Sequence, residues 1–183
     1  MSFEDNLLNN AWILTKHTDI CHFSELYDMK ISIWSIGKTN EAYLQTGIVN
    51  YLSRLKHYTK LDYEEFKDVK PGQTADETKK REAELFLSKI KVEDVVILLD
   101  ERGKHYDSEE FANFLEGHSV NSTKHIIFII GGAFGHHDML RARANQLLSL
   151  SKMTFSHQMV RLFFTEQLYR AYTIIKNEKY HNA

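Results

Sequence analysis

Two short apolar runs, residues 95–99 (VVILL) and residues 126–130 (IIFII), limit most strongly what this chain can fold into. Each run is too short for a buried helix and is rich in β-branched side chains, which favour strands. A continuous apolar run, unlike an alternating one, indicates a strand that is buried on both faces, as in parallel sheets. Helical patterns separate the predicted strands, so the sequence predicts an α/β fold with a mostly parallel sheet flanked by helices.

The remaining elements follow from hydrophobic periodicity and from helix-capping signals. Residues 30–36 (KISIWSI) alternate as a strand does, and Thr74 followed by Glu77 predicts a capping box that opens a helix. Asp107 is expected to cap a short helix after a turn over residues 101–107. The other predicted elements are a helix over 41–56, an edge strand over 61–69, a helix over 137–147 and a helix over 157–177.

Gly131 and Gly132 follow the second apolar run directly, at the carboxyl end of its predicted strand. Glycine lets the backbone approach a ligand closely, and open α/β sheets bind their ligands at this edge. Residues 148–155 (LSLSKMTF) form a second short apolar segment that ends in a polar loop. Together the two features predict a pocket for a small ligand, with ordinary turn glycines as the alternative interpretation.

Length and composition are typical of one globular domain, with 43% hydrophobic and 26% charged residues in a chain of 183. Cys21 is the only cysteine, which excludes an intrachain disulfide and favours a reducing compartment, so a cytoplasmic location is expected. No apolar run approaches the roughly 20 residues of a membrane span. Residues 1–28 have no clean period and are interpreted as an N-terminal extension or the product of an upstream start codon, with the domain proper over 29–183.

Charge is unevenly distributed along the chain. Residues 136–183 contain seven basic and three acidic side chains, a net +4, whereas residues 1–135 stand at −6. A basic final third suits an anionic partner, and its arginines and tyrosines are residue types that bind phosphate and stack on bases. Solvated helix faces with a frayed tail would explain the same count.

Three other sites are considered and disfavoured. Residues 37–39 (GKT) look like the end of a phosphate-binding P-loop, but that motif needs a glycine where Ser32 stands. A dinucleotide-binding fold remains a rival, although its glycine motif should follow the first strand, and here residues 131–135 (GGAFG) come late in the chain. Residues 136–138 (HHD) suggest a metal, but no further ligand stands at helical spacing, so no metal is expected.

Between residues 29 and 181 the chain carries a series of motifs in a fixed order. It resembles the SPOUT-class methyltransferases that methylate N3 of a pseudouridine in bacterial 23S ribosomal RNA. The motifs that carry the resemblance are QTG at 45–47, YLSR at 51–54, LLD at 98–100, IGG at 130–132, LSLSKMTF at 148–155, H-x-x-V-R at 157–161, EQLYRA at 166–171 and YH at 180–181. Residues 1–28 have no counterpart in that family, and the loop over residues 133–136 differs from its usual polar version.

The resemblance implies an α/β fold whose C-terminal part is threaded into a trefoil knot, with S-adenosylmethionine as the cofactor. It also implies a cytoplasmic homodimer whose substrate site is completed by the partner chain, acting on 23S rRNA in the assembled ribosome. The residues implied for the cofactor are Leu99, Gly131, Gly132, Leu150, Ser151, Lys152, Met153, Thr154 and Phe155.

For catalysis, the resemblance points to residues in and after the last helix. His157 or His181 would help to remove the imide proton of the pseudouridine, since a ring nitrogen must lose its proton before or during methyl transfer. Arg161 and Arg170 would hold phosphate or stabilise the developing anion, and Tyr180 would stack on the nucleotide or hydrogen-bond to it. No metal and no membrane take part in this scheme.

Overall fold

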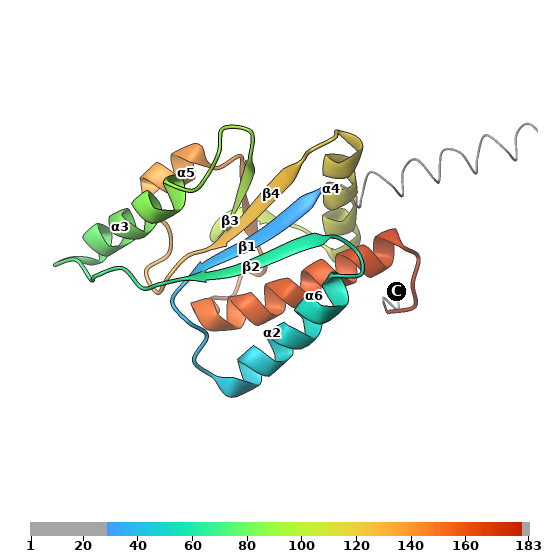
Figure 1. The fold of residues 1–183 in the computed structure, drawn as a ribbon, viewed down its shortest axis with the longest axis horizontal. Coiled ribbons are helices and arrows are strands. Elements are labelled where there is room, and N and C mark those ends of the chain that lie inside the picture. Colours follow the sequence, from blue (N-terminus) through green and yellow to red (C-terminus); the bar gives the residue numbers. More distant parts are fainter. Residues whose placement is uncertain (1–28, 181–183) are drawn as a thin grey trace, which may run out of the picture.

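The computed structural model describes residues 29–180 of the chain. Its centre is a five-stranded sheet of order β2-β1-β4-β3-β5, in which every neighbouring pair is parallel (Figure 1). This arrangement confirms the predicted α/β fold with a parallel sheet. The strands are β1 (Lys30–Ile36), β2 (Lys60–Phe66), β3 (Val95–His105), β4 (His125–Ile130) and β5 (Gln146–Ser149), and the helices are α2 (Ala42–Leu55), α3 (Ala75–Leu87), α4 (Ser108–Val120), α5 (Asp138–Arg143) and α6 (His157–Ile175).

Helices cover both faces of the sheet, which explains the continuous apolar runs. Alternate residues of β4 point to opposite sides, so Phe128 packs with the α4, α2 and α6 side chains whereas Ile127 and Ile129 pack with α3 and α5. The ring of Phe128 lies 4.7 Å from that of Phe164 on α6. With apolar partners on both sides, β4 needs no polar face, as the parallel-sheet pattern predicts. In the described part of the chain no helix is long and apolar enough to cross a membrane.

Two predicted helix caps are present in the structure. Asp107 and Glu110 form the complete capping box that opens α4, because each side chain accepts a hydrogen bond from the other residue's backbone N–H. Thr74 likewise accepts from the N–H of Glu77 at the start of α3. The Glu77 carboxylate, however, accepts from the N–H of Gln73 instead of closing the box on Thr74.

The sequence-based end of the third strand is wrong. Residues 101–105 of the turn expected over residues 101–107 are part of β3, which continues to His105 after an interruption in its pairing with β5. Leu148 is paired with Leu99 before the interruption and with Lys104 after it, so the four residues between them bulge out of the ladder. Bulges of this kind redirect side chains next to functional sites.

Gly103 is the residue that lets the bulged strand return to β5. A Cβ atom at this position would lie 2.5 Å from the backbone of both Leu147 and Leu148. We expect Gly103→Ala to force β3 and β5 apart and to lower the free energy of unfolding by about 1–3 kcal/mol, the usual cost of overpacking. Urea denaturation would measure the loss, with Gly117→Ala as the control because a Cβ there meets no atom within 4 Å. Equal stability of the two variants would contradict this account of the bulge.

The helix predicted over residues 137–147 is also shorter than expected. α5 ends at Arg143, and Asn145 then forms two hydrogen bonds of 2.8 Å with the backbone of Val96, one through its N–H and one through its side-chain oxygen. These bonds replace the next helical turn and place the chain beside β3, where residues 146–149 become β5. Asn favours such local backbone bonding over helix interiors.

Candidate functional site

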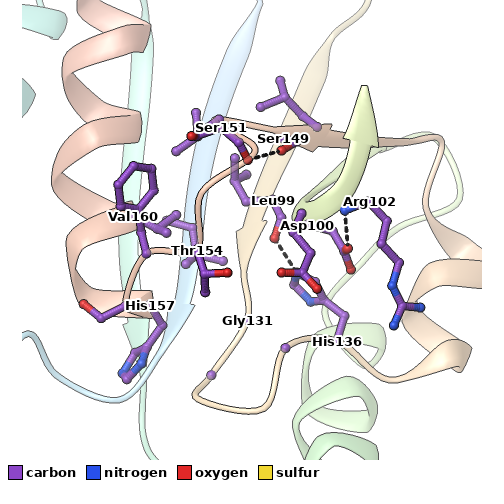
Figure 2. A pocket seen from close by; sticks show the side chains of 18 of the residues that line it. Leu99, Asp100, Arg102, Gly131, His136, Ser149, Ser151, Thr154, His157 and Val160 are labelled. Atoms are coloured by element: carbon purple, nitrogen blue, oxygen red, sulfur yellow. Dashed lines mark hydrogen bonds between the residues drawn. The ribbon is translucent and has the colours of Figure 1, made fainter. Parts of the chain in front are cut away.

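A cavity of about 560 Å³ lies at the carboxyl ends of β3, β4 and β5, against the first turn of α6 (Figure 2). Ligand sites of this size at this edge are the rule in parallel α/β sheets. The loop after β4 and the loop between β5 and α6 supply most of the wall. The lining residues are 99–102, 130–136, 141, 148–151, 153–157 and 160.

Eight of the nine residues expected to bind a cofactor line this cavity. The exception is Lys152, whose side chain is exposed outside it. Gly131 packs tightly against the loop that follows it, since a Cβ on it would be 3.0 Å from the backbone carbon of Gly135. Leu99 and Leu150 also line the cavity and contribute apolar surface to it.

Asp100 places a charged pair in the cavity wall that the sequence reading did not assign to the site. Its carboxylate accepts from the Arg102 N–H at 3.0 Å and from Arg141 Nη2 at 2.9 Å. Burial raises the pKa of Asp100, but the Arg102 N–H and the Arg141 guanidinium together outweigh burial and hold this pKa below its ordinary value. Asp100 is therefore ionised at neutral pH and fixes the bulge of β3 to α5.

His157 lies at the first position of α6 and lines the cavity. Ser156 caps the helix there, because its side-chain oxygen accepts from the N–H of Met159. Burial, followed by the positive charge of Arg161, lowers the pKa of His157 below its ordinary value, although Asp68 acts in the opposite direction. The imidazole is thus mostly neutral at pH 7 and able to accept a proton.

Arg161 does not face the cavity. Its side chain is 0% exposed and donates to the backbone carbonyls of Ile36 and Gly37 and to Glu65. A guanidinium enclosed in this way does not reach a bound nucleotide, so the expected phosphate contact is replaced by a structural one. Hydrophobic periodicity along the last helix does not reveal a partner from another element such as the half-buried Glu65.

Arg170 and Tyr180 lie together, but far from the cavity. Glu166 accepts from Arg170 Nη2 at 2.6 Å and from the Tyr180 hydroxyl at 3.1 Å, and the guanidinium lies 4.9 Å from the centre of the Tyr180 ring. Thirteen residues separate His157 from Arg170 along α6, about 20 Å at the helical rise. His181 lies outside the described residues.

The sequence reading missed several cavity residues, among them Asp100, His136 and Arg141. Asp100 could have been found from the sequence, because it directly follows the apolar run 95–99, just as the glycine pair follows the apolar run 126–130. His136 was weighed only as a metal ligand. Among the described residues, no group of three His, Cys, Asp or Glu is placed to hold a metal ion. His136 instead donates to a backbone carbonyl, and Asp138 pairs with Arg141 at 2.9 Å.

A hydrogen-bonded Ser32–His125–Asp94 chain lies at the opposite edge of the sheet. The Ser32 hydroxyl is 2.8 Å from Nε2 of His125, and Nδ1 of the same ring is 2.7 Å from the Asp94 carboxylate. These residue types form hydrolase triads, but a nucleophile must be accessible to its substrate. Ser32 is 1% exposed, so this chain of hydrogen bonds links the amino ends of the strands and performs no chemistry.

Comparisons with known proteins agree with this geometry. The family model described as "Predicted SPOUT methyltransferase" matches residues 29–181. A protein of Christiangramia forsetii named ribosomal RNA large subunit methyltransferase H is 48% identical over 156 residues, which cover 84% of this chain and 99% of that protein. The protein of the same name from Cytophaga hutchinsonii is 47% identical over 155 residues, which cover 84% of this chain and 100% of the relative.

Solved structures are more distant. A probable methylase family protein from Haemophilus influenzae is 14% identical and gives a TM-score of 0.48, over 86% of this chain and 72% of that chain. The sequence matches span almost all of the described domain and include the motifs whose residues surround the cavity. The chain belongs to the SPOUT methyltransferase family.

Proposed function

We propose that this protein transfers the methyl group of S-adenosylmethionine to N3 of a pseudouridine in 23S ribosomal RNA of the assembled ribosome, in the cytoplasm. The observation that carries the proposal is the cavity at the strand ends, which gathers eight residues that the motifs assign to the cofactor. The ribosomal RNA substrate is supported by relatives at 47–48% identity that are named as large subunit methyltransferases.

The residues of the cavity fit this cofactor. Leu99, Leu148 and Leu150 offer an apolar slot suited to an adenine ring, while Gly131 lines the cavity without adding a side chain to it. The loop over residues 150–155 provides backbone groups for polar contacts. When bound, the cofactor supplies an electrophilic methyl group. The same family membership supports the trefoil knot as the threading of the C-terminal part.

Within the chain, His157 is best placed to take the imide proton. It lines the cavity, and its lowered pKa leaves the imidazole mostly neutral at pH 7. A neutral imidazole near the reacting nitrogen acts as a general base, whereas Arg161 serves to hold the start of α6 against β1. Methyl transfer also requires alignment of the nitrogen with the methyl group, which a rigid cavity wall provides.

We further propose that the protein acts as a homodimer. Arg170 and Tyr180 belong to the predicted substrate-binding set, yet they lie about 20 Å from His157 along α6 in their own chain. A two-fold symmetric partner would bring its own copies of these residues to the cavity, and the reciprocal contact would complete the second site. Each site would then combine the cavity of one protomer with the helix end of the other.

Mixing two inactive variants tests this arrangement. We expect His157→Ala and Arg170→Ala each to lose most activity, and their mixture, after dissociation and reassociation, to recover about a quarter of the wild-type rate, since half of the dimers are mixed and each has one intact site. Methyl incorporation into ribosomes would be measured before and after mixing. A mixture that stays as inactive as its components, although it forms mixed dimers, would show that each site lies within one chain.

The substrate is tested by nucleoside mass spectrometry of 23S rRNA from a strain that lacks this gene. We expect 3-methylpseudouridine to disappear, to return with the wild-type gene, and to stay absent with the matched His157→Ala gene. If the modified nucleoside persists in the deletion strain, the proposed substrate is wrong.

A further inference from the structure

The loop that follows β4 turns back tightly on itself. The Gly135 N–H donates to the Gly132 carbonyl at 3.1 Å, and Gly135 has a φ of +74°, which favours glycine. The turn returns the chain to the end of β4, so that Cε1 of His136 would lie 3.1 Å from a Cβ on Gly131. His136 therefore packs against Gly131, which lines the cavity.

The side chain of His136 is 4% exposed and is held by one specific hydrogen bond. Its Nε2 lies 3.0 Å from the Leu99 carbonyl oxygen, and because a carbonyl only accepts, Nε2 carries the proton (Figure 2). The charged groups that face the ring are Asp100 from β3 and Arg141 from α5. Burial, in the first place, lowers the pKa of His136, so the ring is neutral at pH 7.

The Leu99 carbonyl lies where the pairing of β3 with β4 ends and the cavity begins. Regular pairing between β3 and β4 ends at Leu99 and Ile130, and β3 begins its bulge at the next residue. The hydrogen bond from His136 connects the loop after β4 to β3, next to the last backbone pair of the two strands and in the wall of the cavity. Without it, the Leu99 carbonyl would lose this donor in the wall of the cavity.

We propose that His136 is a positioning residue of the cofactor site, whose Nε2–H holds the Leu99 carbonyl and the 131–136 loop in the arrangement that S-adenosylmethionine binds. The identity of the ligand rests on the proposed function. The role of His136 rests on its own contacts, which no motif of the resemblance assigned. It adds no group to the chemistry and acts through the shape of the cavity.

Calorimetry with S-adenosylhomocysteine, the product of the proposed reaction, tests this role. Gln carries an N–H at nearly the same reach as Nε2, so we expect His136→Gln to bind within about twofold of the wild type and His136→Leu to bind about tenfold more weakly. Thermal unfolding of all three proteins would show that the variants are folded. Wild-type affinity in a folded His136→Leu variant, or an equally large loss in His136→Gln, would overturn the proposal.

The pH dependence of the same affinity separates positioning from packing. Protonation would keep the Nε2–H donor but would bury a charged ring, so we expect wild-type affinity to be constant around pH 7–8 and to fall as the pH drops through a value below that of ordinary imidazole. This fall should be absent in His136→Gln and present in His157→Ala, which removes the other cavity histidine. A fall that survives in His136→Gln would contradict the assignment. If the wild type does not bind at all, the proposed function fails instead.

Discussion

Replacing His157 with alanine should slow single-turnover methyl transfer about 10²–10⁴-fold, the usual contribution of a general base. The residue lines the cavity at the start of α6, and the reaction cannot proceed while the ring nitrogen keeps its proton. Transfer of labelled methyl groups to ribosomes, with cofactor in excess, would measure the rate constant. His105→Ala is the matched control, because that histidine is exposed at the end of β3 and outside the cavity.

The pH dependence of the methyl-transfer rate tests the same role of His157. Burial and Arg161 lower the pKa of His157, and only the neutral ring accepts a proton, so the rate should be highest above that pKa and fall as the pH drops through it. His157→Ala should lose this acidic limb. If His157→Ala and His181→Ala both kept the wild-type rate, neither histidine would be the base.

Replacing Arg161 with alanine should lower the free energy of unfolding by about 3–5 kcal/mol, since it removes a fully buried guanidinium and leaves the half-buried Glu65 carboxylate without its partner. The guanidinium joins α6 to Gly37 after β1 and to Glu65 in β2, so its loss also leaves backbone carbonyls without a donor. Urea denaturation would measure the change. Lys30→Ala is the control, because the exposed Lys30–Asp62 pair should contribute at most about 1 kcal/mol.

Lysine should not replace Arg161. An ammonium group cannot reproduce the forked donors that the guanidinium directs at Ile36, Gly37 and Glu65. We therefore expect Arg161→Lys to be destabilised nearly as much as Arg161→Ala. An Arg161→Ala protein that keeps its stability but fails to methylate would return this residue to a direct role in catalysis.

The parallel sheet could be predicted because its signal is local. Apolar runs bounded by turn residues identify β3 and β4, and the cap at Asp107 depends on side chains three residues apart. The bulge at Gly103 and the early end of α5 at Arg143 could not be predicted, because both depend on backbone contacts with strands distant in the sequence. Tertiary hydrogen bonds of this kind override local propensity.

The candidate site, too, could be predicted only in part from the sequence. The glycine pair predicted where a ligand would bind, since strand ends and their loops follow directly from the strand pattern. The charge count of the basic final third did not show that its arginines are engaged within the chain. Arg161 is enclosed with Glu65, Arg170 pairs with Glu166, and Arg141 pairs with Asp100 and Asp138. A net charge counted along the sequence does not show which charges pair.

The most direct measurement is a crystal structure of the protein soaked with S-adenosylmethionine at saturating concentration. The cofactor is expected in the cavity between Leu99, Gly131 and the loop over residues 150–155, with its methyl group on the side of His157. A cofactor bound at any other place, or a cavity that stays empty while the protein methylates ribosomes, would contradict the account.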